Sequence, residues 1–190
     1  MAKNGRVCAA AIPFALLLAC TDAAKAPAEA AMKAAGEAVS SLKGDAEKFA
    51  PDTVRAVEAS YASAKDLVAK QDYQGALAVA QGIPTKAKEA LAAAAAKKDE
   101  LVKAWNEVLW TLPNMLSASK ARVEILTRAR RLPANLDKAT LEKAKAELAA
   151  IEAGWSKASA EYAAGGMAAA VSLATDLKAR ARDVMMSLGL

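Results

Sequence analysis

The side chains that most often carry catalysis are scarce in this 190-residue chain. It has no histidine and only two cysteines, Cys8 and Cys20. Histidine is the side chain that exchanges protons most readily near neutral pH, and it is the commonest ligand of transition metals. We therefore expect no zinc, copper or haem site, no other metal and no cofactor.

Serine, lysine and carboxylate side chains leave one narrow route to catalysis. Ser117 with Lys120, or Ser156 with Lys157, could form a nucleophile and base pair, and two carboxylates could act as acid and base. The carboxylates, however, recur beside lysine and arginine, as in Glu142-Lys143, which is typical of a solvated helix face. A glycine-rich phosphate loop is also missing. We expect no enzyme activity.

Cys20 ends a hydrophobic run at the amino terminus. Residues 1–6 carry Lys3 and Arg6, residues 7–18 are mostly apolar, and small residues follow. Twelve residues of helix reach only about 18 Å, whereas a bilayer core is about 30 Å thick. A basic start, a short apolar segment and a small-residue exit describe a secretory signal peptide. We assign residues 1–19 to the signal.

The exit sequence Leu17-Leu18-Ala19-Cys20 resembles the bacterial lipobox. That resemblance implies cleavage before Cys20, a thioether-linked lipid on its sulfur and acylation of its new amino group, for example by palmitate. More than one acyl chain gives stable membrane anchoring. The alternative is ordinary signal cleavage nearby, at small residues such as Ala23 and Ala24, which would remove Cys20 or leave it free.

The residues after Cys20 indicate in which membrane a lipoprotein would be held. Gram-negative lipoproteins retained in the inner membrane commonly have aspartate directly after the cysteine, whereas here Thr21 takes that place. By that resemblance we expect a lipoprotein of the outer membrane that faces the periplasm. Loss of Lys3 and Arg6 with the signal would leave 24 basic against 21 acidic residues, a net charge of +3. For an exported protein of mild charge we expect no nucleic-acid partner.

The segment "WNEVLWTLPNML" gathers large apolar side chains. Trp105 and Leu109 share a helical face, and Trp110 points elsewhere. Two interpretations stay open. These side chains either fill the core between two helical hairpins, or form an exposed patch that contacts a partner or lipid. Trp105 and Trp110 are therefore candidate partner-binding residues.

The segment "SKARVEILTRARR" gathers positive charge. It contains Lys120, Arg122, Arg128, Arg130 and Arg131. Lys120, Arg128 and Arg131 fall near one side of a helix, and Glu124 offsets part of the charge. A solvated face explains these residues, and contact with lipid phosphate, lipopolysaccharide or another envelope polyanion is the alternative. Arg122, Arg128 and Arg131 complete the candidate partner-binding set.

Alanine, leucine, lysine and glutamate dominate the chain and favour helices, while residues typical of strands are few. We predict an all-α protein, an elongated antiparallel bundle built from two αα-hairpins and a central helical segment. After a lipidated tether, 20–27, we expect one helical-bundle domain, 28–190. Its parts would be a first helix over 28–49, a hairpin over 52–98, a central segment over 99–135 and a hairpin over 136–190.

The spacing of the apolar residues, together with prolines and turn-forming residues, defines these boundaries. Apolar residues alternate at spacings of three and four, the coiled-coil pattern of helices packed lengthwise. Ala50-Pro51 predicts a helix start, and Gln71-Asp72 and Gly165-Gly166 predict turns. Pro84 should kink or break the second helix of the first hairpin, and Pro113 should end the helix that contains Trp105.

The two hairpins can be aligned with each other. Residues 57–88 match 151–182, so that Tyr61 meets Trp155 and the two predicted turns coincide. Alanine richness inflates such matches, so shared helix–turn–helix architecture is a safer prediction than duplication.

Residues 45–90 resemble a family of short, alanine-rich bacterial envelope lipoproteins of unknown function. The resemblance rests on Ala50-Pro51, Ala64, Asp72-Tyr73 and Ala76-Leu77. It implies a periplasmic helical hairpin and no known activity, and residues 100–135 depart from that pattern. The hairpin also looks like a lone tetratricopeptide unit, but no repeat of about 34 residues follows, so we expect no such array.

These observations predict a lipid-anchored, non-enzymatic structural or interaction module that binds a protein or envelope polymer through helix faces. The alternative function is a carrier or chaperone-like binder that holds a hydrophobic ligand between the hairpins, which requires an enclosed apolar cavity. The sequence does not indicate the oligomeric state.

Overall fold

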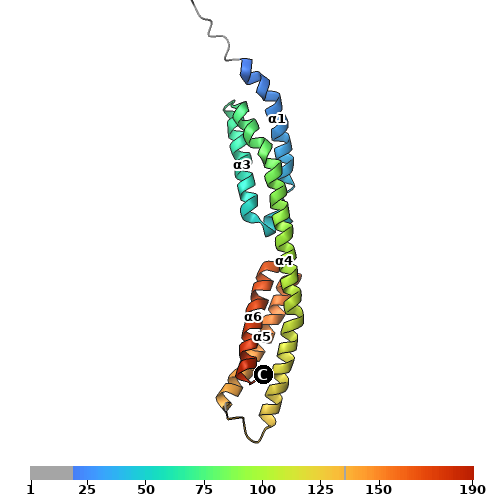
Figure 1. Cartoon of the computed structure of the whole chain (residues 1–190), viewed down its shortest axis with the longest axis vertical. Helices are drawn as coiled ribbons and strands as arrows, with labels where there is room; N and C mark the ends of the chain where they lie inside the picture. Colours follow the sequence, from blue (N-terminus) through green and yellow to red (C-terminus); the bar gives the residue numbers. More distant parts are fainter. Residues whose placement is uncertain (1–18, 135) are drawn as a thin grey trace, which may run out of the picture. The chain divides into compact units, whose positions relative to one another are not determined.

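A computed structural model describes residues 19–134 and 136–190, with side chains described from Ala23 onward. These residues form helices joined by turns, without strands, which confirms an all-α helical bundle (Figure 1). The helices are α1 (Ala19–Ser40), α2 (Asp45–Phe49), α3 (Pro51–Ala69), α4 (Tyr73–Arg128), α5 (Lys138–Ala163) and α6 (Met167–Ser187).

The described part of the chain divides into two compact units, the first ending at Ala96 and the second formed by Lys97–Leu190. The division falls inside α4, which supplies a helix to each unit. Between the buried Ala94 and the buried Leu101, the side chains are mostly exposed alanines and charged residues. Such residues keep a helix continuous but bury little apolar surface, so the core of each unit ends there.

The first unit packs α1, α2 and α3 with the beginning of α4. Its core contains few large side chains, among them Leu42, Val57 and Ile83, and many alanines. The helices can therefore approach closely. At Gly36 on α1, a Cβ would lie 2.8 Å from the hydroxyl of Tyr61 on α3, so glycine makes room for this tyrosine.

The amino-terminal helices differ from the prediction. The helix expected over 28–49 is two helices, α1 and α2, and α1 already begins at Ala19, so the segment 20–27 that we expected to be a tether is helical. The break between α1 and α2 is at Gly44, whose φ of 91° suits glycine. Helix α3 begins at Pro51, as predicted.

Pro113 does not end its helix, contrary to prediction, and of the kink or break expected at Pro84 the break is absent, because α4 continues through both prolines to Arg128. Each proline removes one backbone hydrogen bond. Each also has buried residues on both sides, Ile83 and Ala87 around Pro84 and Leu112 and Leu116 around Pro113. Packing on both sides of the proline fixes the helix across it, since tertiary burial supplies most helical stability in proteins. Most of the central segment expected over 99–135 is thus the end of α4.

The second unit packs the remainder of α4 with α5 and α6, and its core side chains are larger. Leu101, Trp105 and Leu112 of α4 are buried, as are Leu148 and Leu177 of α5 and α6. These positions follow the predicted periodicity. The predicted hairpin over 136–190 is present as α5 and α6, joined by the Gly165-Gly166 turn.

The two units repeat the same helix–turn–helix. Shifted so that Val57 meets Ile151, α3 and α5 end at equivalent residues, and α4 and α6 begin at equivalent residues. Both turns contain a residue with positive φ, Gln71 (61°) and Gly165 (89°). The positions that are buried in both hairpins pair as follows: Val54/Leu148, Val57/Ile151, Ala64/Ala158, Ala76/Ala170, Ala80/Ala174, Ile83/Leu177, Ala87/Ala181, Ala90/Val184 and Ala94/Leu188.

Candidate functional site

Trp105 lies in the aromatic core of the second unit. It is buried, and its ring stacks on Trp155 of α5 at a centroid distance of 5.2 Å and on Tyr162 at 4.2 Å. Because Trp105 shares its helical face with the buried Leu101 and Leu112, the fold directs it inward. Trp105 was a candidate partner-binding residue. Its burial fits the other interpretation, in which this tryptophan belongs to the core.

Trp110, five residues later, lies on the outer face of the same helix. Its side chain is 75% exposed, and the neighbouring Leu109 is 41% exposed. A rotation of about 100° per residue puts Trp110 nearly opposite the core positions Val108 and Leu112. Of the two interpretations of this segment, the core interpretation fits Trp105. Trp110 is the tryptophan that is exposed and so could contact a partner or lipid.

The three candidate arginines have different surroundings. The half-buried Arg122 donates a hydrogen bond from Nε to the carbonyl oxygen of Leu188, 3.1 Å away, and so ties α4 to the end of α6. Arg128 is exposed and lies 3.8 Å from the Glu124 carboxylate. Arg131 is exposed in the connection after α4. Arg122 therefore has a structural contact, whereas Arg128 and Arg131 face solvent.

Cys20 falls within α1, but its side chain and residues 1–18 lie outside the described part of the structure. The structure therefore does not test the predicted signal peptide or lipidation. Among the described residues, no helix combines the length and hydrophobicity that crossing a membrane requires.

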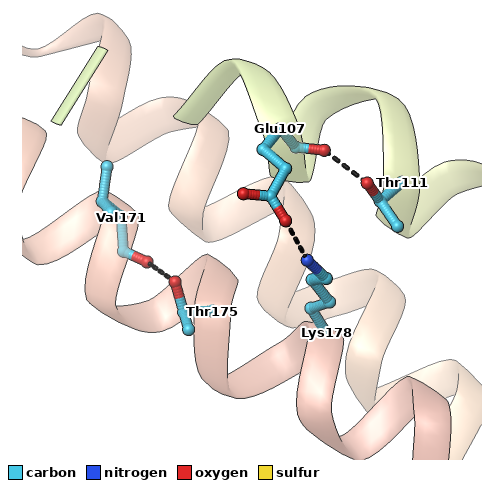
Figure 2. Close-up of polar contacts among 5 residues, drawn as sticks. All are labelled: Glu107, Thr111, Val171, Thr175 and Lys178. Atoms are coloured by element: carbon cyan, nitrogen blue, oxygen red, sulfur yellow. Dashed lines mark hydrogen bonds and ion pairs between the residues drawn. The ribbon is translucent and has the colours of Figure 1, made fainter. Parts of the chain in front are cut away.

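An ion pair between helices that the sequence pattern did not indicate fastens α4 to α6. Lys178 Nζ donates to the Glu107 carboxylate at 2.5 Å (Figure 2). This hydrogen bond, with the charge of the ammonium, lowers the pKa of the Glu107 carboxyl below its ordinary value. On the same turn, the Thr111 hydroxyl donates to the Glu107 carbonyl oxygen. The pair joins residues far apart in sequence, so periodicity on one helix could not reveal it.

One groove between α4 and α5 brings together residues that could do chemistry. A hollow of about 390 Å³ is lined by Ser117, Lys120, Glu152 and Ser156, beside Trp155. Lys120 forms an ion pair with Glu152, so its ammonium group contacts a carboxylate and not a serine hydroxyl. Ser156 donates its hydroxyl hydrogen bond to the Glu152 carbonyl oxygen at 3.2 Å. Neither serine is hydrogen-bonded to a lysine in the described structure, so the groove does not assemble the suspected pair.

Two grooves of the second unit have a mixed polar and apolar lining. A second groove, of about 370 Å³ between α5 and α6, is lined by charged side chains such as Lys143, Glu147 and Arg180 together with Val184. Both grooves mix polar with apolar side chains, which gives no specific support to a buried hydrophobic ligand. The described residues also contain no group of three side chains suited to hold a metal ion.

Comparison with protein families, with curated proteins and with solved structures found no match. The resemblance of residues 45–90 to short envelope lipoproteins therefore stays a prediction.

Proposed function

We propose that this protein is an exported lipoprotein, acylated at Cys20 and held at the periplasmic face of the outer membrane. Its helical body acts there as a non-enzymatic interaction module. The amino-terminal sequence supports the anchoring, because a basic start and a short apolar run lead to Leu17-Leu18-Ala19-Cys20. Thr21 in place of aspartate supports the outer membrane as the destination.

The exposure of Trp110 carries the interaction part of the proposal. Of the other two tryptophans of the second unit, Trp105 is buried and stacks on the half-buried Trp155, whereas Trp110 is 75% exposed beside Leu109. A tryptophan buries a large area when a partner covers it, and tryptophan is enriched where single residues dominate binding energy. Arg128 and Arg131 add charge to the same unit.

Crosslinking in intact membranes, followed by purification of the protein, tests this proposal. Trp110→Ala should reduce the yield of a crosslinked partner by about tenfold or more, the effect typical of a dominant interface residue. Leu91→Ala is the matched control, because Leu91 is an exposed apolar residue, 39% exposed, in the first unit. An Arg128→Ala/Arg131→Ala variant tests the basic residues. If neither variant loses a partner that wild type captures, both surfaces are wrong.

A further inference from the structure

Positive side chains gather at the end of the second unit where α4 gives way to α5. Arg128 ends α4, Arg130 and Arg131 follow in the connection, and Lys138 begins α5. All four side chains are exposed. Lys138 also lines a hollow together with Leu126 of α4, which places the start of α5 beside the end of α4. The turn of the chain thus concentrates the four cations at one end of the unit.

The connection between α4 and α5, which contains Arg130 and Arg131, is held in place where it meets α5. Leu136 is buried, and its amide donates to the Pro133 carbonyl oxygen at 3.0 Å. Asp137 then caps α5 by accepting a hydrogen bond from the Thr140 amide at 2.7 Å. The apolar anchor and the helix cap hold the backbone, while Arg130 and Arg131 stay in solvent.

Nearby carboxylates neutralise little of this charge. Glu124 lies 3.8 Å from Arg128, and both side chains are largely exposed, so their attraction is weak. The Asp137 carboxylate already accepts the capping hydrogen bond from the Thr140 amide. Glu142 forms an ion pair with Lys145 at 2.9 Å. In the part of the chain that the structure describes, Arg130, Arg131 and Lys138 form no ion pair or hydrogen bond through their side chains. They are available to an external anion.

Apolar groups lie beside the cations. Ile125 is 61% exposed one helical turn before Arg128, on the same side of α4. The half-buried Leu132 lies at the same end, where it lines a hollow of about 200 Å³ with the buried Leu126 and Leu141 and with the charged Lys138, Glu142 and Lys145. Ile125 and Leu132 are thus the apolar side chains that a bilayer could contact. A soluble polyanion would gain little from these side chains. An anionic bilayer offers both phosphates for the cations and hydrocarbon for the apolar groups.

We propose that this end of the second unit, formed by Ile125 and the cations Arg128, Arg130, Arg131 and Lys138, binds the surface of an anionic phospholipid bilayer. The cations contact lipid phosphates, and Ile125 enters the interfacial region. The inference rests on the proposed function in one respect, since a protein held in the envelope always meets such a surface. It assigns a second membrane contact, separate from the lipid at Cys20.

Vesicle co-sedimentation of the full chain tests this contact. Cys20→Ala is present in every sample, so that acyl chains contribute nothing. Vesicles of phosphatidylcholine with phosphatidylglycerol are compared with phosphatidylcholine alone, which measures the binding that does not depend on lipid charge. Lys3, Arg6 and the apolar residues 7–18 are present in every variant, so differences between variants exclude their contribution. Each cation near an anionic surface contributes about 1 kcal/mol, or about fivefold in partitioning. Arg128→Gln/Arg130→Gln/Arg131→Gln should therefore weaken anionic-vesicle binding on the order of a hundredfold, and added salt should weaken wild-type binding.

The control removes the same charge from the first unit. Lys33→Gln/Lys70→Gln/Lys88→Gln changes three exposed lysines and should reduce binding far less. Ile125→Gln should lower binding to anionic vesicles several-fold without changing net charge. Circular dichroism confirms that each variant is helical.

Two outcomes overturn the inference. If both triple variants lose binding equally, net charge rather than this end attracts the bilayer. If Ile125→Gln has no effect and soluble polyphosphate displaces the protein fully, the site binds a polyanion and not a bilayer. Neither outcome depends on lipidation, so lipid labelling at Cys20 can succeed while this inference fails, or the reverse.

Discussion

Trp105 and Trp110 lie five residues apart on one helix and have opposite surroundings. Trp105 is buried between Trp155 and Tyr162, and Trp110 is 75% exposed. Trp105→Ala should lower the free energy of unfolding of the second unit by about 3–5 kcal/mol, since it removes a core aromatic. Trp110→Ala should change it by no more than about 0.5 kcal/mol.

Tryptophan fluorescence during urea unfolding measures both variants, because all three tryptophans lie in the second unit. A Trp110→Ala variant as unstable as Trp105→Ala would show that Trp110 is packed, which would remove the support for a contact surface there.

Ser119 presents a different situation within the same core. Its hydroxyl oxygen is fully buried and has no hydrogen-bond partner in the described structure. A buried polar group without a partner destabilises the fold. Ser119→Ala should therefore raise the free energy of unfolding by about 1 kcal/mol. Ser117→Ala, at an exposed position of the same helix, gives the contribution of helix propensity alone. A loss of stability in Ser119→Ala would mean that the hydroxyl has a partner.

At the scale of elements, the two hairpin turns share one backbone geometry but not one residue type. The amide of Asp72 donates to the Leu67 carbonyl oxygen at 2.9 Å, and the amide of Gly166 donates to that of Glu161 at the same distance. This is the helix ending that favours glycine at the residue of positive φ. Gly165 meets that preference, whereas Gln71 does not.

Exchanging these residues tests the shared geometry. Gln71→Gly should stabilise the first unit by about 0.5–1 kcal/mol, because glycine adopts positive φ without strain. Gly165→Gln should destabilise the second unit by about 1 kcal/mol for the same reason. Lys70→Gly is the control, since Lys70 has a φ of −83° and gains nothing from glycine. Thermal unfolding followed by circular dichroism gives the signs, and a loss on Gln71→Gly would contradict the turn geometry.

The Asp137 carboxylate at the start of α5 makes the stability of the fold depend on pH. The backbone hydrogen bond from Thr140 lowers the pKa of its carboxyl below the ordinary value of 3.8. Because the folded-state pKa is below the unfolded one, the stabilisation is complete above the unfolded pKa and is lost as pH falls through the folded pKa. Asp137→Asn keeps a capping side chain but does not titrate. Urea unfolding from about pH 6 down to about pH 2 should show a smaller loss of stability in this variant than in wild type. Equal losses would show that the carboxylate is not the cap.

The elements also show what the sequence can predict. The turns at Gln71-Asp72 and Gly165-Gly166, and the start at Pro51, were predicted because each depends on local residues. The continuity of α4 through Pro84 and Pro113 was not, because it depends on core contacts made on both sides of each proline. Local rules give the cost of a proline in a helix but not the packing that offsets it.

The same distinction applies to the candidate site. Periodicity already separated Trp105 from Trp110 by face, but only packing shows which face is covered. Arg122 was grouped with Arg128 and Arg131, although its guanidinium contacts the carbonyl of Leu188, which is distant in sequence. Lys138 was overlooked because ten residues separate it from Arg128, and the turn of the chain brings the two to one end.

For the whole molecule, two units with the same helix–turn–helix and different cores suggest divided roles. The first core is largely alanine, whereas the second contains the aromatic stack and carries both the exposed Trp110 and the basic end. The proposed contacts therefore all lie in the second unit, whereas the proposed anchor, Cys20, lies near the start of α1 in the first. In this account the protein is an attached helical body, and Cys20 determines where it acts.

Metabolic labelling with a palmitate analogue, combined with membrane fractionation, tests that central claim most directly. Wild type should incorporate the label and fractionate with the outer membrane, and Cys20→Ala should lose the label and the stable membrane association of a multiply acylated protein. Cys8→Ala, which changes the other cysteine of the chain, should behave like wild type. A Cys20→Ala protein that still incorporates the label, or a wild type that never does, would contradict the account.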